Sequence, residues 1–216
     1  MAGNGGNHGG NGGDHVIRSV QALREVIGAE IPGLDLKNQA RLDEFATDFL
    51  SRSPFLVLAT SNADGHLDAS PKGDAPGFVH VLDERTLAIP DRPGNKLVYG
   101  HLNILANPKV GVIFMIPGTP ETLRVNGTAE LSSDPELLAR LSARGRPAVL
   151  AIRVRVEECF FHCAKAFIRS QLWKPDTWPE RHEISFGAMF AKVTGSGEDA
   201  ARAVDAAVEK DYRENL

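Results

Sequence analysis

The sequence predicts a mainly β domain of the α+β class, in which a small closed barrel carries peripheral helices. Three observations predict it. Short apolar runs separated by turn residues fill the middle of the chain, about six or seven of them have the pattern of strands, and nearly all are joined by the short connections of antiparallel neighbours. A chain of 216 residues, 42% of them hydrophobic and 24% charged, is typical of a soluble globular protein with one domain and terminal extensions.

The N-terminal part of the chain is expected to lie outside the barrel. Residues 1–14 contain seven Gly and three Asn, a composition that predicts a disordered tail because it cannot offset the entropy of ordering. Apolar residues at helical spacing follow in two stripes, from Val16 to Ile27 and from Leu42 to Leu50. These stripes predict two N-terminal helices.

Two hairpins open the barrel. In the first, the runs Phe55–Thr60 and His66–Ser70 lie on either side of the turn sequence Asn-Ala-Asp-Gly at 62–65. In the second, Phe78–Leu82 and Thr86–Pro90 flank an Asp-Glu-Arg turn. Each pair of runs is close enough in the chain to form neighbouring antiparallel strands.

A helix is expected to interrupt the strands once. Lys96–Ala106 carries apolar residues at helical spacing, and Asn107-Pro108 ends it before the buried strand Val110–Ile116. Further along, Asp134 has the features of a helix N-cap followed by Pro and Glu, and it begins a short helix that is expected to end near Gly145.

The remaining strands show the period-two alternation of a sheet with one apolar face. Thr122, Arg124 and Asn126 alternate with apolar residues and therefore share a polar face, and Val149–Glu157 alternates in the same way. The predicted domain organisation is a tail (1–14), N-terminal helices (15–51), a barrel core (52–173) and a C-terminal helical extension that packs on the barrel (174–216).

Composition argues against several classes of protein. The formal net charge is -4, and no stretch is basic enough to predict a nucleic-acid surface. The longest apolar run, Val110–Pro117, is far shorter than the roughly 20 residues of a membrane-spanning helix. The first residues lack the pattern of a secretory signal, and Cys159 and Cys163 are too close in the chain to form a disulfide framework, so a reducing cytoplasm is expected.

No side chain is predicted to act as a catalytic nucleophile or metal ligand. The chain lacks the GxSxG, Walker A, GxGxxG and HExxH motifs. Cys159, His162 and Cys163 are the only grouping that resembles a metal site, and a structural zinc site needs four ligands. The favoured interpretation is two half-buried thiols beside a hydrogen-bonded His.

The segment Ile89–Lys96 contains a candidate anion site. Arg92 and Lys96 lie near the predicted start of a helix, where the macrodipole disfavours cations. A bound phosphate would resolve this conflict, because free N–H groups, the positive end of the helix and two cations suit a dianion. The alternative, that both side chains are solvated or paired with Asp91 and Glu84, stays open.

Six segments of the core have a specific order of hairpin, hairpin, helix, strand and polar-faced strand: Phe55–Thr60, Asp64-Gly65, Asp68–Asp74, Leu87–Lys96, Asn107–Gly111 and Leu123–Ala129. In this order they resemble the pyridoxamine 5'-phosphate oxidase-like, FMN-binding split-barrel superfamily. The resemblance extends from Phe49 to Trp173. Phe161–Lys165 and Arg169–Trp173 are similar to the C-terminal signature of a bacterial branch of FMN-dependent enzymes.

The resemblance implies a split β-barrel of the FMN-binding type with N- and C-terminal helices, which forms a homodimer with two FMN molecules in clefts between the subunits. It also implies which residues contact the cofactor. The residues beneath the flavin are Ser70, Pro71, Lys72 and Gly73, and those beside the ring or ribityl chain are Ile89 and Pro90. By the same resemblance, Asn95 and Lys96 contact the phosphate, where Arg92 replaces the charge that Asn95 lacks. Thr122 and Arg124 are expected to approach the flavin from the polar face of a later strand.

The expected function is an FMN-dependent oxidoreductase that exchanges a hydride with a small organic substrate, with NADH or NADPH as a candidate electron donor. FMN is expected rather than FAD because the chain has no dinucleotide fingerprint. The N-terminal Arg and Tyr segment and the C-terminal Arg-x-His segment that hold pyridoxal phosphate in this family's oxidases have no counterpart here, so oxidation of vitamin B6 is not expected. Lys165 and Arg169, four residues apart, are candidates for contact with the FMN phosphate or an anionic substrate. The alternative is a non-catalytic protein that binds flavin, deazaflavin or haem, the last through His162.

Overall fold

The computed structural model describes residues 15–215, and the predicted tail of residues 1–14 lies outside them. The chain divides into two units, Met1–Leu36 and Lys37–Leu216. The first contains α1 (Val20–Ile27), whose N-cap Ser19 accepts a hydrogen bond from the backbone N–H of Ala22. No residue of α1 is buried.

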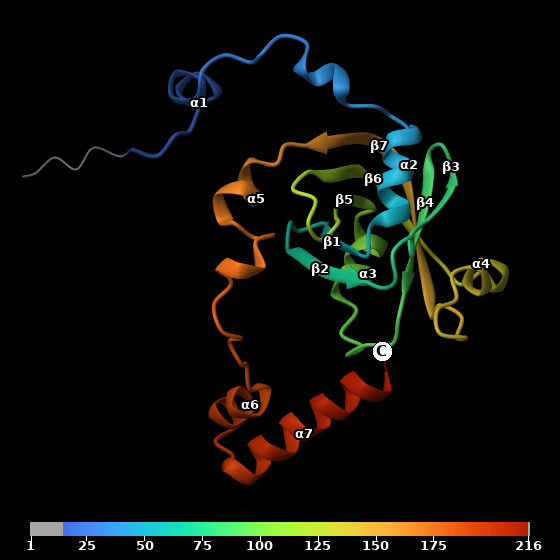
Figure 1. Ribbon diagram of the computed structural model, residues 1–216, viewed down its shortest axis with the longest axis vertical. Coiled ribbons are helices and arrows are strands. Elements are labelled where there is room, and N and C mark those ends of the chain that lie inside the picture. The colour runs from blue at the N-terminus through green and yellow to red at the C-terminus, as the bar shows by residue number, and fades with distance from the viewer. Residues whose placement is uncertain (1–14, 216) are drawn as a thin grey trace, which may run out of the picture. The chain divides into compact units, whose positions relative to one another are not determined.

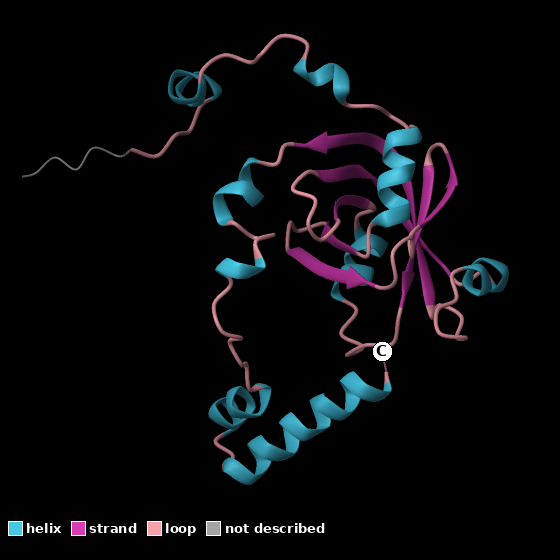
Figure 2. Ribbon diagram, viewed as in Figure 1, coloured by secondary structure: helices cyan, strands magenta, loops and turns pink. Residues whose placement is uncertain are grey.

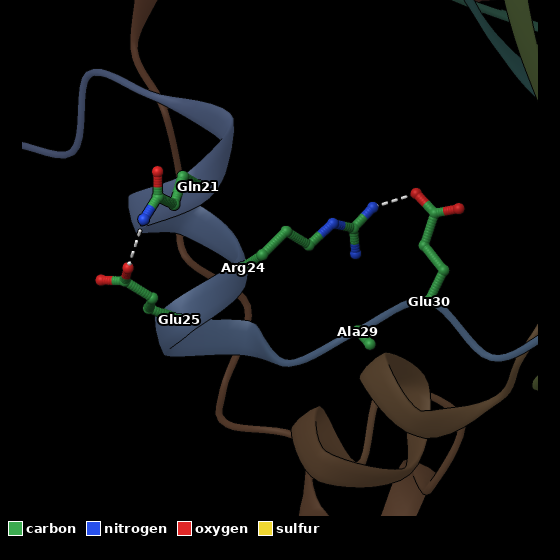
Figure 3. A pocket seen from close by; sticks show the side chains of 5 residues that line it. All are labelled: Gln21, Arg24, Glu25, Ala29 and Glu30. Carbon is green, nitrogen blue, oxygen red and sulfur yellow. Dashed lines mark hydrogen bonds and ion pairs between the residues drawn. The ribbon is translucent and has the colours of Figure 1, made fainter.

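Polar contacts stabilise the first unit locally (Figure 3). The side chain of Gln21 donates to Glu25 one turn later, at 3.1 Å, and Arg24 forms an ion pair with Glu30. The 3-10 helix η1 (Leu34–Lys37) then leads into the second unit.

Seven strands form one antiparallel sheet in the second unit, which confirms the predicted fold class (Figure 2). The strand order is β2-β1-β5-β6-β7-β4-β3. The strands are β1 (Phe55–Ser61), β2 (Leu67–Gly73), β3 (His80–Asp83), β4 (Thr86–Asp91), β5 (Lys109–Met115), β6 (Thr122–Ser132) and β7 (Leu150–His162). Both predicted hairpins are present, and β7 continues five residues beyond the predicted Glu157.

The core lies inside the curved sheet. Alternate residues of β1 are buried, among them Leu56 and Leu58, whereas β4 is buried continuously from Leu87 to Pro90. Helix α2 (Glu44–Arg52) contributes Ala46, Phe49 and Leu50 to the core, and its N-cap Asp43 accepts a hydrogen bond from the N–H of Ala46 at 2.8 Å. The predicted second apolar stripe is therefore a core-facing helix.

The segment before α2 closes the free edge of β7, a feature the sequence did not predict. Gln39 exchanges two backbone hydrogen bonds with Cys159, at 2.9 and 2.7 Å, and the N–H of Leu42 donates to the carbonyl of Glu84 at 2.7 Å. These contacts fix residues 37–42 beside the distal half of β7.

A β-bulge changes the pairing between β6 and β7. Asn126 lies opposite Glu158 but Gly127 lies opposite Val156, so Glu157 is an extra residue on β7. A Cβ atom on Gly127 would lie only 2.0 Å from the carbonyl oxygen of Arg155, so the close approach of the strands requires glycine here.

Two helix boundaries differ from the prediction. Helix α3 (Tyr99–Ala106) begins three residues after Lys96, because Lys96 and Val98 have left-handed backbone conformations, with φ of 60° and 51°. Helix α4 (Pro135–Arg140) begins at its Asp134 cap as predicted but ends before Gly145.

Helices and loops alternate in the chain after β7. It contains α5 (Lys165–Ser170), η2 (Pro175–Thr177), α6 (Phe186–Thr194) and α7 (Glu198–Glu214) (Figure 1). The carboxylate of Asp205 joins α7 to the start of α6, where it accepts hydrogen bonds from Ser185 and from the N–H of Gly187. No residue of α7 is buried, and packing of this extension on the barrel stays a prediction. Among residues 15–215, no helix has the length and apolar character needed to cross a bilayer.

Candidate functional site

Three ionisable side chains meet where β2, β4 and α3 come together. Lys72 on β2 forms an ion pair with Asp91 at the end of β4, with 2.8 Å between Nζ and Oδ1. The other carboxylate oxygen lies 3.5 Å from Nε2 of His101, in the first turn of α3. All three side chains are largely buried, with exposed fractions of 16%, 20% and 14%.

Burial alone would raise the pKa of the Asp91 carboxyl. The approach of His101 and the ion pair with Lys72 outweigh that effect and hold the pKa of Asp91 below its usual range. Asp91 is therefore a carboxylate at neutral pH. Its partner Lys72 is held in place by this ion pair.

The start of α3 approaches β2 closely because Gly100 has no side chain. A Cβ atom at this position would lie 3.1 Å from a carboxylate oxygen of Asp68. That oxygen accepts a hydrogen bond of 2.5 Å from Ser70, and the buried amide of Asn103 donates to Thr60 at 3.1 Å. These contacts fix the N-terminal half of α3 against the first hairpin.

The turn between β4 and α3 contains the predicted anion-binding residues, and the structure gives them different surroundings. Arg92 donates to Asp74 at 2.8 Å and to the carbonyl of Leu141 at 2.9 Å, so its guanidinium is held by the protein itself. The side chain of Asn95 accepts from the N–H of Leu97. Lys96 is exposed and makes no side-chain hydrogen bond or ion pair with any described residue.

The N-terminus of α3 is open. Its N-cap residue, Val98, has a left-handed conformation and provides no side-chain hydrogen bond to the helix. The first N–H groups of a helix have no partner within the helix, so those of α3 are without a side-chain acceptor. Lys96 lies two residues before this cap.

The other predicted contacts from β2 and β4 divide into two groups. Ser70 and Lys72 lie on the face of β2 that meets α3 and β4, whereas Pro71 and Gly73 lie on its exposed face. Ile89 and Pro90 are buried in β4 and lie opposite β7. The side chain of Ile89 forms part of the core.

Four predicted residues lie elsewhere in the chain. Thr122 is 2% exposed at the start of β6, and the guanidinium of Arg124 lies 5.1 Å from the centre of the Phe160 ring. Lys165 and Arg169 are exposed on α5. No hydrogen bond or ion pair within residues 15–215 joins these four to the cluster around Asp91.

The two cysteines are in different environments. Cys159 is buried, and burial together with the charge of Asp43 raises the pKa of its thiol to about 12. Cys163 and His162 are exposed, so the prediction of two half-buried thiols is wrong. In the described part of the chain, no three His, Cys, Asp or Glu side chains are grouped closely enough to hold a metal ion.

Sequence reasoning did not identify Asp91, His101, Asp68 or Asp74 as site residues. The sequence suggested Asp91 only as a partner for Arg92 or Lys96, yet its partners are Lys72 and His101. The sequence did contain one indication of the role of Asp91. A carboxylate at the end of a buried strand needs a hydrogen-bonding or charged partner.

Solved structures with related folds were found by comparison with the whole chain. HupZ of group A Streptococcus is 19% identical, with a TM-score of 0.46 over 55% of this chain and 92% of that chain. An FMN-binding protein from Syntrophomonas wolfei is 10% identical, with a TM-score of 0.44 over 56% and 86% of the two chains. A protein described as F420 reductase is 21% identical, with a TM-score of 0.39 over 53% and 94%.

Comparison with curated protein sequences finds no significant match. The model of the family described as pyridoxamine 5'-phosphate oxidase matches residues 42–163, more than half of the chain. This match spans α2 and all seven strands, including the Lys72, Asp91 and His101 cluster. The chain belongs to the pyridoxamine 5'-phosphate oxidase family, whose members have the FMN-binding split-barrel fold.

Proposed function

We propose that this protein is an FMN-dependent oxidoreductase and that Lys96, together with the N-terminus of α3, binds the FMN phosphate. One observation carries the proposal: in a chain of this family, an exposed cation that has no partner among residues 15–215 lies beside an uncapped helix N-terminus. Unpaired N–H groups, the positive end of the helix dipole and an ammonium group together suit a phosphate dianion.

The backbone of the turn supports a binding role. Lys96 and Val98 are both in the left-handed region, which is unfavourable for residues other than glycine and especially for a β-branched one. Such conformations cost of order 1–3 kcal/mol each and cluster at ligand-binding sites. The contacts of Arg92 with Asp74 and Leu141 fix one end of this turn, and the packing of α3 fixes the other.

FMN, when bound, supplies the hydride-transfer chemistry. The residues of this chain bind and orient it. Lys72 and Ser70 present polar groups on the inner face of β2, and Asp91 holds Lys72 in one position. Because Asp91 neutralises Lys72, the phosphate proposal depends on Lys96 rather than on Lys72.

We further propose that two copies of the chain form a dimer through α3. Tyr99, Leu102 and Leu105 follow one another at three-residue intervals on this helix and are 59%, 56% and 72% exposed. The neighbouring Leu97 and Val98 are also exposed. A contiguous apolar surface of this kind beside a site favours a protein interface, and a second subunit would cover the cofactor.

Lys96→Ala is expected to weaken FMN binding by about 1.5–3 kcal/mol, which is about one to two decades in Kd, because it removes a charged hydrogen-bond donor from the phosphate. Calorimetric titration with FMN measures the effect. The side chain is exposed, so the free energy of unfolding should change by less than about 0.5 kcal/mol.

Lys109→Ala is the matched control. Lys109 is 61% exposed and pairs with Glu157 at 2.8 Å, away from the turn. Its replacement should leave the FMN affinity unchanged. Equal FMN affinities of the parent and both variants would show that Lys96 is not a phosphate ligand. Separately, release of FAD rather than FMN from the purified protein would contradict the choice of FMN.

The oxidoreductase proposal is tested by anaerobic addition of NADH and NADPH to the FMN-loaded protein. Transfer of a hydride to the flavin should bleach its visible absorbance with at least one of the two donors. A flavin that stays oxidised with both donors would contradict reduction by nicotinamide and favour a carrier protein.

Leu102→Asp is expected to convert the dimer to a monomer, because it places a charge in the apolar surface of α3. Leu102 is exposed in the single chain, so the fold should remain intact. Light scattering measures the mass, and Val193→Asp on α6, 87% exposed in the single chain, is the control. A parent protein that is monomeric when loaded with FMN would overturn the dimer proposal.

A further inference from the structure

A cavity of about 640 Å³ lies between α2, residues 37–41 and the ends of β6 and β7. Figure 1 shows α2 beside this part of the sheet. None of the residues that line the cavity is among those proposed to bind FMN. Its volume is in the range of small-molecule sites, which is about 300–1,000 Å³.

Aromatic side chains form much of the cavity wall. Phe160 and Phe161 come from β7, and Phe45 and Phe49 come from α2. Phe49 is buried and packs edge-on against Phe161, with 5.5 Å between the ring centres. Phe45 is 66% exposed although it belongs to the first turn of a core-facing helix. A ligand in the cavity would remove this apolar surface from water.

The charges around the cavity favour an anion. Lys37 lies 5.4 Å from the centre of the Phe160 ring and donates only to a backbone carbonyl, that of Phe161. Arg41 has no hydrogen bond or ion pair with any described residue. Of the two lining acids, Asp48 pairs with Arg52, whereas Asp43 accepts the capping N–H of Ala46 and keeps its charge. Lys37 and Arg41 therefore face one carboxylate without a cation partner in the described chain, Asp43, and the lining has a net positive charge once Arg52 is counted with Asp48.

We propose that this cavity binds a small amphiphilic anion, namely an aryl or alkyl group that carries a carboxylate. The apolar part packs against Phe45, Phe49 and the Phe160–Phe161 pair, and the carboxylate interacts with Lys37 and Arg41. Residues 1–14 do not provide such a ligand, because their only apolar side chains are those of Met1 and Ala2. The site is separate from the proposed FMN site.

The test is calorimetric titration of the full chain, saturated with FMN, with 4-phenylbutyrate and with the matched neutral alcohol 4-phenylbutanol. The carboxylate is expected to bind at one site per chain and about tenfold more tightly than the alcohol, because a charged hydrogen bond adds to the apolar contacts. No saturable binding, or equal affinity for the two compounds, would overturn the proposal.

Variants assign the binding to the cavity. Arg41→Ala is expected to weaken 4-phenylbutyrate binding about tenfold and leave the alcohol unaffected, whereas Phe45→Ala weakens both. Both residues are exposed, and circular dichroism checks the fold. Arg153→Ala, on β7 but paired with Glu130 outside the cavity, is the control and should change neither affinity. An Arg41→Ala variant that binds 4-phenylbutyrate as tightly as the parent would contradict the assignment. In protein prepared without flavin, displacement of bound 4-phenylbutyrate by added FMN would also contradict it.

Discussion

The carboxylate of Asp91 connects parts of the barrel that the sheet itself does not join. In the strand order, β2 is at one edge and β4 is near the other, so no backbone hydrogen bonds link them. Two ion pairs cross this gap: Lys72 with Asp91, and Arg92 with Asp74 just beyond β2, each at 2.8 Å. Both are largely shielded from solvent, so removing one partner would leave a poorly hydrated charge. The split barrel is thus closed by side chains, and the site forms at that closure.

The same contacts determine the shape of the turn that precedes α3. Asp91 ends β4 and also faces His101, and Arg92 is fixed to Asp74, so the chain has few residues in which to reach Tyr99. The left-handed conformations of Lys96 and Val98 accommodate this constraint. As a result, the helix starts late with an open N-terminus, and Lys96 has no side-chain partner in the described part of the chain. The strained turn is therefore the same segment in which we propose the phosphate site.

Local signals predicted most of the fold, and contacts between distant residues account for what was missed. The turn at 62–65 and the Asp134 cap act within a few residues, so the first hairpin and the start of α4 follow directly from the sequence. The start of α3, the bulge at Glu157 and the pairing of Gln39 with Cys159 depend on strands that meet only in the folded chain. For the candidate site, the sequence pattern predicted Lys96 and the family resemblance implied Lys72, but neither predicted the partners that surround them. Arg92 illustrates the reason, because its partner Asp74 is 18 residues away and no periodic pattern relates them.

The most direct test of this account is the free energy of unfolding of the parent and of Asp91→Asn as a function of pH. The folded pKa of Asp91 is lowered, so its stabilising contribution is complete above its ordinary pKa of about 3.9 and is lost as the pH falls through the folded value. Asp91→Asn should therefore be less stable than the parent by about 1–3 kcal/mol at pH 7, a range reduced from that of fully buried pairs because Asp91 is partly exposed. The difference should shrink as the pH falls below about 3.9. Equal stability of the two proteins at pH 7 would contradict the central role of Asp91.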